Sequence, residues 1–409
     1  MKRPISWTAK KIKMKKILWI SPRWPEPPND GARIATFELI KHLALEKDFS
    51  LTFLAIVPEN ESLKAIPGID SNQIIILKRK ISDCSPFFRM LRHPNFPITF
   101  DSFIDSNLTN EVNQVLAAGA WDAVIFDGIH AAVPFIKCGL PKNTAFFYRA
   151  HNAECKLWER MALVNSGIKR YALLYQSYLV KKFEMMLLKQ SKCTFPVSHD
   201  DAAFFLGLVK EAKIKVVHIG QTFEIKTRPV THTKSPITLG FIGRLDWLPN
   251  QQGLTWFLTH VWPEILQKKI PIQLIISGSG DSSWISPYLT LAQIKFLGRV
   301  PNIEDFYQGI DASIVPLFFG SGTRVKVIEA SRLAIPCVST AIGVEGCPLR
   351  SGHSYLNAES IEDWVSVLRS TTQTEFQMIG GFAFEAMKSN YDSENCSKEL
   401  IAAIKQSIS

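Results

Sequence analysis

Long apolar runs are missing from this sequence of 409 residues. No stretch approaches the roughly 18 apolar residues that a membrane-spanning helix needs. The apolar run at residues 17–20 is followed by Pro22 and Pro25 and is too short to form the apolar region of a signal peptide. We therefore expect neither a transmembrane helix nor a secretory leader, and a protein that works in the cytoplasm.

Paired cysteines are missing as well. The seven cysteines are odd in number, scattered, and never spaced as C-x-x-C. This argues against a disulfide scaffold or a zinc site and favours reduced thiols. The chain also has no Asp-x-Asp pair placed to hold a metal ion, so we expect no metal site.

The net charge of +10 is concentrated at one end of the chain. Seven lysine and arginine residues and no acid lie within positions 1–16, so the remaining residues carry seven charges fewer, a net +3. That body charge does not indicate nucleic-acid binding. Residues 1–13 are expected to form a disordered basic tail, with contact between this tail and an anionic membrane surface as the alternative. Met14 would also be a natural chain start, so whether residues 1–13 belong to the working protein stays open.

Short apolar runs alternate with glycine-bearing loops and helical spacing along the chain. Strands are predicted at residues 16–20, 51–57, 74–77, 123–126, 145–148, 193–197, 237–242, 272–276, 295–297, 312–315 and 336–339. Helices are predicted at 36–45, 155–190, 253–266 and 302–308. This alternation predicts an α/β protein with two doubly wound, Rossmann-like domains facing a cleft.

The apolar periodicity also suggests where the domains end. Residues 14–220 are expected to form the first domain, 221–236 a linker rich in Thr, Pro and Lys, and 237–390 the second domain. Residues 391–409 are expected to form a C-terminal helix that can pack back on the first domain. Within 155–190, we expect the apolar stripe to be core, with a membrane-lying face as the alternative; its members are Tyr171, Leu174, Tyr178, Phe183 and Met186.

Residues 316–330, PLFFGSGTRVKVIEA, combine a strand end, a glycine-rich turn and a helix that opens near Thr323. Glycines allow close backbone approach, and the unpaired N–H groups of a helix start bind anions. Arg324 and Lys326 add two cations, and Glu329 falls on the same helix face as Lys326, where it can accept hydrogen bonds from sugar hydroxyls. The pattern fits a nucleotide sugar; the alternative is an ordinary solvated helix pair.

His151 follows the strand predicted at 145–148, with Asn152 and Glu154 beside it. Ligands of doubly wound sheets collect outside the carboxyl ends of the strands, so His151 is a candidate functional residue. The alternative is a packing or capping histidine.

These segments resemble GT-B glycosyltransferases, and most closely the retaining glycosyltransferase family four in its bacterial envelope and exopolysaccharide branch. The resemblance covers nearly everything from Met14 on and is strongest over 237–346. It is carried by GRLDW (243–247), GSG (278–280), GRV (298–300), the stretch 316–330 and PCVST (336–340), with AHNAE (150–154) and FPVSHDD (195–201) in the first half.

The resemblance implies a role for each matching position. Arg244 and Lys326 would hold the donor diphosphate, Glu329 the ribose diol, and His151 the transferred sugar. Gly31 would approach the phosphates across the cleft. The candidate catalytic residues are thus His151, Arg244, Lys326 and Glu329, and the candidate donor-binding residues are Gly31, Gly243, Val300 near the base, Gly320, Ser321, Gly322, Thr323 and Arg324.

The implied activity is metal-independent hexosyl transfer, with retention at the sugar carbon, from a nucleotide-diphosphate sugar to a saccharide or lipid-linked acceptor. No cofactor other than the donor substrate is implied, and the first domain would take the acceptor. The sequence does not identify the nucleotide, the sugar, the acceptor or the oligomeric state.

Two positions depart from the family pattern. The first acid of its paired-glutamate motif falls at Ser321, and its usual lysine after Gly-Arg is replaced by Pro249-Asn250. These departures favour, as an alternative, a non-catalytic GT-B subunit that supports an active partner. A sugar epimerase or phosphorylase on the same fold is a third hypothesis, but an epimerase needs acid–base carboxylates facing the sugar, and no such set is evident.

Overall fold

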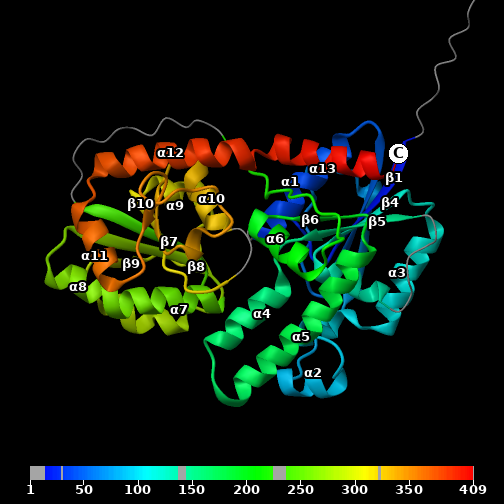
Figure 1. Ribbon diagram of the computed structural model, residues 1–409, viewed down its shortest axis with the longest axis horizontal. Coiled ribbons are helices and arrows are strands. Elements are labelled where there is room, and N and C mark those ends of the chain that lie inside the picture. The colour runs from blue at the N-terminus through cyan, green and yellow to red at the C-terminus, as the bar shows by residue number, and fades with distance from the viewer. Residues whose placement is uncertain (1–13, 29–30, 137–143, 224–235, 321–323, 409) are drawn as a thin grey trace, which may run out of the picture.

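The computed structural model describes residues 14–28, 31–136, 144–223, 236–320 and 324–408 (Figure 1). Two α/β bodies lie side by side, and each is built on a six-stranded parallel sheet. Residues 1–13 and 224–235, which hold the predicted tail and most of the predicted linker, lie outside the described residues.

The first sheet has the strand order β3-β2-β1-β4-β5-β6. Its strands are β1 (Lys15–Ser21), β2 (Phe49–Pro58), β3 (Ile74–Arg79), β4 (Ala123–Asp127), β5 (Ala145–Ala150) and β6 (Cys193–Pro196). Both faces of the sheet are buried, as is usual for parallel strands. On β1, Leu18 and Ile20 pack on one face while Ile17 and Trp19 pack on the other.

Helices cover both faces of this first sheet. In chain order the helical segments are α1 (Gly31–Leu45), η1 (Ser71–Gln73), α2 (Pro86–Arg92), η2 (Ile98–Phe103), α3 (Ser106–Ala118), η3 (Ile129–Phe135), α4 (Glu154–Leu163), α5 (Gly167–Gln190) and α6 (His199–Leu208). The switch between β1 and β4 leaves their carboxyl ends facing the second body, where a doubly wound sheet binds its ligand.

The second sheet has the order β12-β11-β10-β7-β8-β9. Its strands are β7 (Ile237–Arg244), β8 (Ile272–Ser279), β9 (Ile294–Phe296), β10 (Ala312–Val315), β11 (Cys337–Ser339) and β12 (Leu356–Asn357). Its helical segments up to residue 370 are α7 (Leu248–Trp256), η4 (Phe257–Val261), α8 (Trp262–Gln267), η5 (Ser283–Thr290), α9 (Ile303–Gln308), α10 (Val325–Arg332), η6 (Ile342–Val344) and α11 (Ile361–Ser370).

The last two helices run from the second body back to the first along one edge of the molecule (Figure 1). They are α12 (Gln373–Tyr391) and α13 (Ser393–Ile408). Leu400 and Ile404 of α13 are fully buried in the core that also contains Leu39 and Leu43 of α1. Lys405 adds a hydrogen bond of 3.1 Å from its Nζ to Glu46 Oε1.

The doubly wound α/β architecture predicted from the sequence is confirmed, and every predicted strand is present within a few residues. Two helices differ from their predictions. The segment 155–190 breaks into α4 and α5, and the helix predicted at 253–266 is interrupted by the π-helical turn η4. Pro263 lies in the first turn of α8, where its missing N–H leaves the preceding helix without a continuous hydrogen-bond ladder.

The prediction that the stripe on 155–190 is core is wrong for its first half. Tyr171, Leu174 and Tyr178 are exposed, whereas Phe183 is buried against the sheet. The first half of α5 projects beyond the sheet (Figure 1). Within the described ranges, no helix is both long and apolar enough to span a membrane.

Candidate functional site

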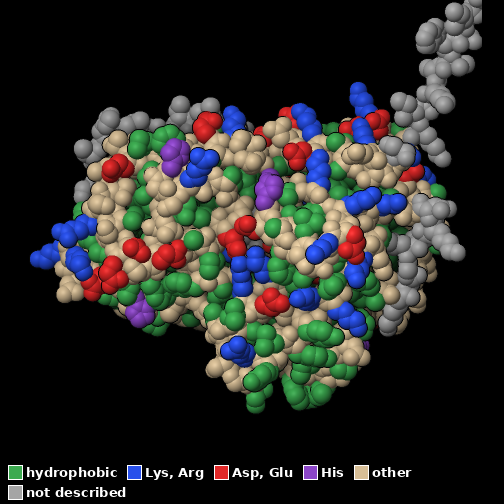
Figure 2. All heavy atoms as spheres, in the orientation of Figure 1, with side chains coloured by type: hydrophobic (Ala, Val, Ile, Leu, Met, Phe, Trp, Pro, Cys, Tyr) green, Lys and Arg blue, Asp and Glu red, His purple; other side chains and the backbone are tan. Residues whose placement is uncertain are grey.

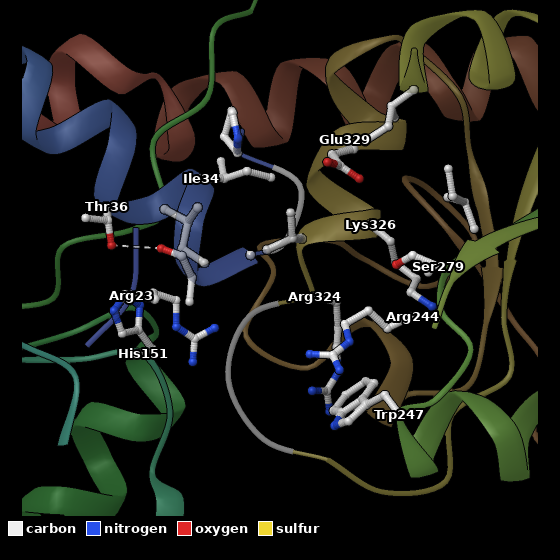
Figure 3. Close-up of a pocket in the computed structure, with 18 of the residues that line it drawn as sticks. Arg23, Ile34, Thr36, His151, Arg244, Trp247, Ser279, Arg324, Lys326 and Glu329 are labelled. Carbon is white, nitrogen blue, oxygen red and sulfur yellow. Dashed lines mark hydrogen bonds between the residues drawn. The ribbon is translucent and has the colours of Figure 1, made fainter. Parts of the chain in front are cut away.

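A cavity of about 670 Å³ lies between the two bodies and is lined by residues of both. Its size is that of an ordinary small-molecule site. Figure 3 shows its two walls: His151, Thr36 and Arg23 come from the first body, and Arg244, Arg324 and Lys326 with their neighbours come from the second.

The start of α10 forms part of the second wall. Arg324 precedes the helix as its N-cap residue, and because its guanidinium has no acceptor it makes no cap hydrogen bond to the first N–H groups of α10. The helix therefore presents the positive end of its dipole. Gly320, before the helix, has φ +141°, and a Cβ there would lie 2.7 Å from Arg324 Nη2, so the turn depends on glycine.

Lys326 is held by the protein on two sides. Its Nζ donates to Asn250 Oδ1 at 2.8 Å and lies 4.3 Å from the centre of the Phe241 ring. Asn250 is itself fixed, because its Nδ2 donates to the Arg244 carbonyl at 2.7 Å. Burial, with a further contribution from Arg324, lowers the pKa of Lys326 to about 7. An anion in the cavity would favour the protonated amine.

Gly243 leaves the room that this arrangement needs. A Cβ at Gly243 would lie 2.9 Å from Asn250 Nδ2 and 3.0 Å from Lys326 Nζ. Both distances are shorter than ordinary contacts, so any larger residue would displace the lysine. Gly243 therefore acts on the site through its lack of a side chain.

Glu329 lies one turn beyond Lys326 on α10 and lines the same cavity. Burial raises its pKa to about 7, against the opposing influence of Arg332 and Lys326. A carboxyl group with this pKa is partly protonated near neutral pH, so it can accept hydrogen bonds from hydroxyls and also donate one to them.

Arg244 sits at a more open part of the wall, with 56% of its side chain exposed. Its guanidinium makes two hydrogen bonds to Asp246, from Nε to Oδ1 at 3.0 Å and from Nη2 to Oδ2 at 2.7 Å. A diphosphate that reached Arg244 would share it with this carboxylate. Asp246 therefore sets the orientation of Arg244 through two of its five donors.

His151 faces this wall from the end of β5 and contacts both members of the buried ion pair between Asp127 and Arg149. Its Nε2 lies 2.8 Å from Asp127 Oδ1, and Arg149 Nη1 lies 3.2 Å from its Nδ1. Because a guanidinium only donates, Nδ1 accepts and the ring proton lies on Nε2. Burial and Arg149 lower the pKa of His151 despite Asp127, so the ring is neutral at pH 7.

Asp127 organises this side of the cavity. Burial acts to raise its pKa, but His151, Arg149 and Thr36 together hold that pKa below its ordinary value. Trp19 Nε1 also donates to it, at 3.2 Å. The carboxylate thus stays ionised and fixes the histidine ring.

The two bodies touch beside the cavity. Gly31, at the start of α1, lies so close to Val325 that a Cβ on the glycine would be 2.5 Å from Val325 Cγ2. Further along, Arg160 of α4 makes two hydrogen bonds of 2.6 and 2.7 Å to Glu345 and donates to the Gly320 carbonyl. Helix α4 of the first body is thus tied to Gly320 of the second body.

The structure brings most of the predicted site residues into one cavity. Its lining contains Gly31, His151, Gly243, Val300, Arg244, Arg324, Lys326 and Glu329. Gly320 adjoins Arg324, and Ser321, Gly322 and Thr323 lie outside the described residues.

Two residues that shape the site were not predicted. Asp127 directly follows the strand predicted at 123–126, and a carboxylate at such a strand end is itself a signal for a ligand edge. Asn250 stands where the family pattern has a lysine, and it is the partner that positions Lys326. No spacing in the sequence connects residues 250 and 326.

Residues 236–371 match the family model described as "Glycosyl transferases group 1". This match lies over the second body and agrees with the enzyme class expected from the sequence. A Klebsiella pneumoniae protein described as "Uncharacterized 44.6 kDa protein in cps region" is 24% identical over 398 residues, which cover 93% of this chain and 97% of that protein.

Solved structures of low sequence identity share the whole fold. Anabaena HepE in complex with UDP and glucose is 12% identical, with a TM-score of 0.62 over 96% of this chain and 99% of that one. Sucrose-phosphate synthase from Thermosynechococcus elongatus is 12% identical, with a TM-score of 0.69 over the same shares. The pneumococcal O-GlcNAc transferase GtfA in complex with UDP and GlcNAc is 9% identical, with a TM-score of 0.64 over 97% and 99%. The GT-B fold is thereby confirmed.

Proposed function

We propose that this chain transfers a hexosyl group from a nucleotide-diphosphate sugar to a saccharide or lipid-linked acceptor, as a retaining enzyme of glycosyltransferase family four. One observation carries the proposal: a helix start with buried cations faces His151 across a cavity that both bodies line. That cavity has room for a nucleotide sugar.

In the proposed complex, the donor diphosphate lies at the start of α10 between Arg244, Arg324 and Lys326. Glu329, one turn on, accepts hydrogen bonds from the ribose, and the backbone near Val300 meets the base. The exposed edge of His151 faces the transferred sugar. Uridine is the first base to test, because HepE and GtfA are solved with UDP.

The chemistry needs little beyond these groups. The bond between the anomeric carbon and the diphosphate oxygen breaks while a bond to the acceptor oxygen forms. The acceptor attacks from the donor's own face, and its proton passes to the departing diphosphate. Cations already in place stabilise the developing charge, and one such donor is worth about 2.7–4 kcal/mol. We propose that no metal ion or further cofactor takes part.

The two bodies have different roles in this proposal. We propose that residues 14–220 bind the acceptor, that 237–390 bind the donor, with 221–236 as linker, and that 391–409 tie the two together. The cps-region relative supports a place in exopolysaccharide or cell-envelope synthesis. We propose that such a reaction takes place at the cytoplasmic side of the membrane and that the basic tail, residues 1–13, makes peripheral contact with that membrane.

Thermal-shift measurements with UDP-, GDP- and ADP-sugars test the proposal. A ligand at 100 times its Kd adds about 2.7 kcal/mol to the free energy of unfolding, so one nucleotide class should raise Tm clearly above the others. Glu329→Gln should weaken the shift, and Glu362→Gln, at an exposed glutamate on α11, should leave it unchanged. No shift with any nucleotide sugar would refute the proposal.

A non-catalytic GT-B subunit is the second candidate, and Ser321 with Pro249-Asn250 favours it. It predicts donor binding without turnover. Release of nucleoside diphosphate from the donor by the purified chain, lost in Lys326→Ala, would exclude it.

A further inference from the structure

Exposed apolar side chains are concentrated on one projecting part of the first body. Ten of the eighteen large hydrophobic residues exposed in the described ranges lie on α2, on the α4–α5 turn and on the first half of α5. Ile168 is 90% exposed and Tyr171 is 74% exposed. We call this surface the aromatic lobe; it consists of Phe87, Phe88, Leu91, Leu163, Val164, Ile168, Tyr171, Leu174, Tyr175 and Tyr178.

The aromatic lobe is one surface made of two segments far apart in sequence. Tyr175 of α5 donates from its hydroxyl to the Pro94 carbonyl at 2.9 Å, and Gln176 Oε1 accepts from the Ile98 backbone N–H at 2.8 Å. These bonds tie the segment around α2 to α5. In Figures 1 and 2 the lobe projects below both sheets, and apolar side chains gather at its end.

The charged side chains within the two segments that form the aromatic lobe are of one sign. Residues 84–100 and 161–183 contain no Asp or Glu. They contain six basic residues, Arg89, Arg92, Lys169, Arg170, Lys181 and Lys182. Aromatic and aliphatic side chains flanked by Lys and Arg suit the interface of an anionic lipid bilayer. A symmetric contact with a second copy would instead bring the same basic groups face to face.

The aromatic lobe is also continuous with the cavity. Helix α4 begins at the cavity wall, where Glu154 and Leu157 line it, and ends at Leu163 on the lobe. The six residues from Leu157 to Leu163 span about 9 Å of helix. A molecule anchored in a bilayer under the lobe would therefore have its polar end within reach of the cavity.

We propose that the aromatic lobe docks this protein on the surface of an anionic lipid membrane, with Ile168, Tyr171 and Phe88 entering the interface and the six basic residues meeting lipid phosphates. This docking is separate from the basic tail and does not rest on sugar transfer. If the proposed function holds, it narrows the acceptor to one held at a membrane.

Vesicle co-sedimentation of the full chain tests the proposal. The probes are phosphatidylcholine vesicles with and without 30% phosphatidylglycerol. We expect binding to the anionic vesicles that weakens with salt. Ile168→Ser with Tyr171→Ser should lower the partition coefficient by roughly tenfold or more. Lys169→Gln with Arg170→Gln should lower it by roughly fivefold per residue.

Matched variants separate the aromatic lobe from other surfaces. Leu45→Ser with Met378→Ser removes two exposed apolar side chains elsewhere, and binding should persist. Lys268→Gln with Lys269→Gln removes two exposed basic side chains outside the aromatic lobe, and vesicle binding should again persist. Circular dichroism and the nucleotide-induced thermal shift should be unchanged in all four variants, which shows that they fold.

Three results would overturn the proposal. The first is equal binding by wild type and both lobe variants. The second is loss of binding only when residues 1–13 are deleted, which would assign it to the tail. The third is a dimer that the lobe variants dissociate in the absence of vesicle binding, which would make a second copy the occupant.

Discussion

Gly31→Ala tests whether the close approach of the two bodies beside the cavity matters for catalysis. The added Cβ would lie 2.5 Å from Val325 Cγ2, whereas carbon atoms in contact stay about 3.5–4.0 Å apart. The two bodies must therefore separate by about 1 Å at this point. Misplacing reacting groups by about 1 Å can cost a hundredfold in rate.

We expect kcat/KM to fall by about a hundredfold in Gly31→Ala, because the donor and the His151 wall come from different bodies. Nucleotide affinity should change far less, since Lys326 and Arg244 both belong to the second body. Alanine is a better helix former than glycine, so loss of folding is not expected at this position of α1.

Val325→Ala supplies the rescue. It removes Cγ2, and the next atom of Val325, its Cβ, lies 3.4 Å from the added carbon, which is close to an ordinary contact. The double variant should recover most of the lost kcat/KM, and Val325→Ala alone should stay near wild type. Release of nucleoside diphosphate measures all four proteins. Wild-type activity in Gly31→Ala, or no recovery in the double variant, would refute the reasoning.

Three further predictions concern the walls of the cavity and their contact. Asp127→Asn breaks a fully buried pair with an arginine 3.1 Å away, so urea unfolding should show a loss of about 3–5 kcal/mol. Because the folded pKa of Asp127 is lowered, its contribution to stability is present above its unfolded pKa and should fade on acidification. Since burial lowers the pKa of Lys326 to about 7 and a bound diphosphate raises it again, nucleotide binding above pH 7 should take up a proton. Calorimetry in buffers of different ionisation enthalpy measures this uptake, and UDP affinity should fall by up to about tenfold per pH unit. Proton uptake that persists in Lys326→Met would contradict the assignment of the proton to Lys326. Glu345→Gln removes the charge that pairs with Arg160, and because both side chains are partly exposed, donor affinity should weaken by roughly fivefold or less; a larger loss would mean that the bridge does more than hold the two bodies together.

Much of the fold could be predicted because its signals are local. The strand, glycine turn and helix start at 312–332 follow one another in sequence, so their shared geometry follows from short-range rules. His151 at the cavity could likewise be predicted, because ligands of doubly wound sheets bind outside the carboxyl ends of the strands.

The partners of these residues depend on contacts that the sequence does not display. Asn250 of α7 reaches Lys326 of α10, and Asp127 at the end of β4 reaches His151 just after the neighbouring strand β5, so both contacts are products of tertiary packing. The prediction that the apolar stripe on 155–190 is core is wrong in its first half for another reason. An apolar helix face has the same period whether it meets a core or projects from the molecule, and only the packed structure separates Tyr171 from Phe183.

The central claim is that Lys326 and the start of α10 bind the diphosphate of a nucleotide sugar. Isothermal titration of UDP into wild type, Lys326→Ala and the control Lys398→Ala, an exposed lysine on α13, tests it most directly. The account predicts at least tenfold weaker binding in Lys326→Ala alone, since hydrogen bonds to charged groups are worth about 1.5–3 kcal/mol. Equal affinity in all three proteins would contradict it.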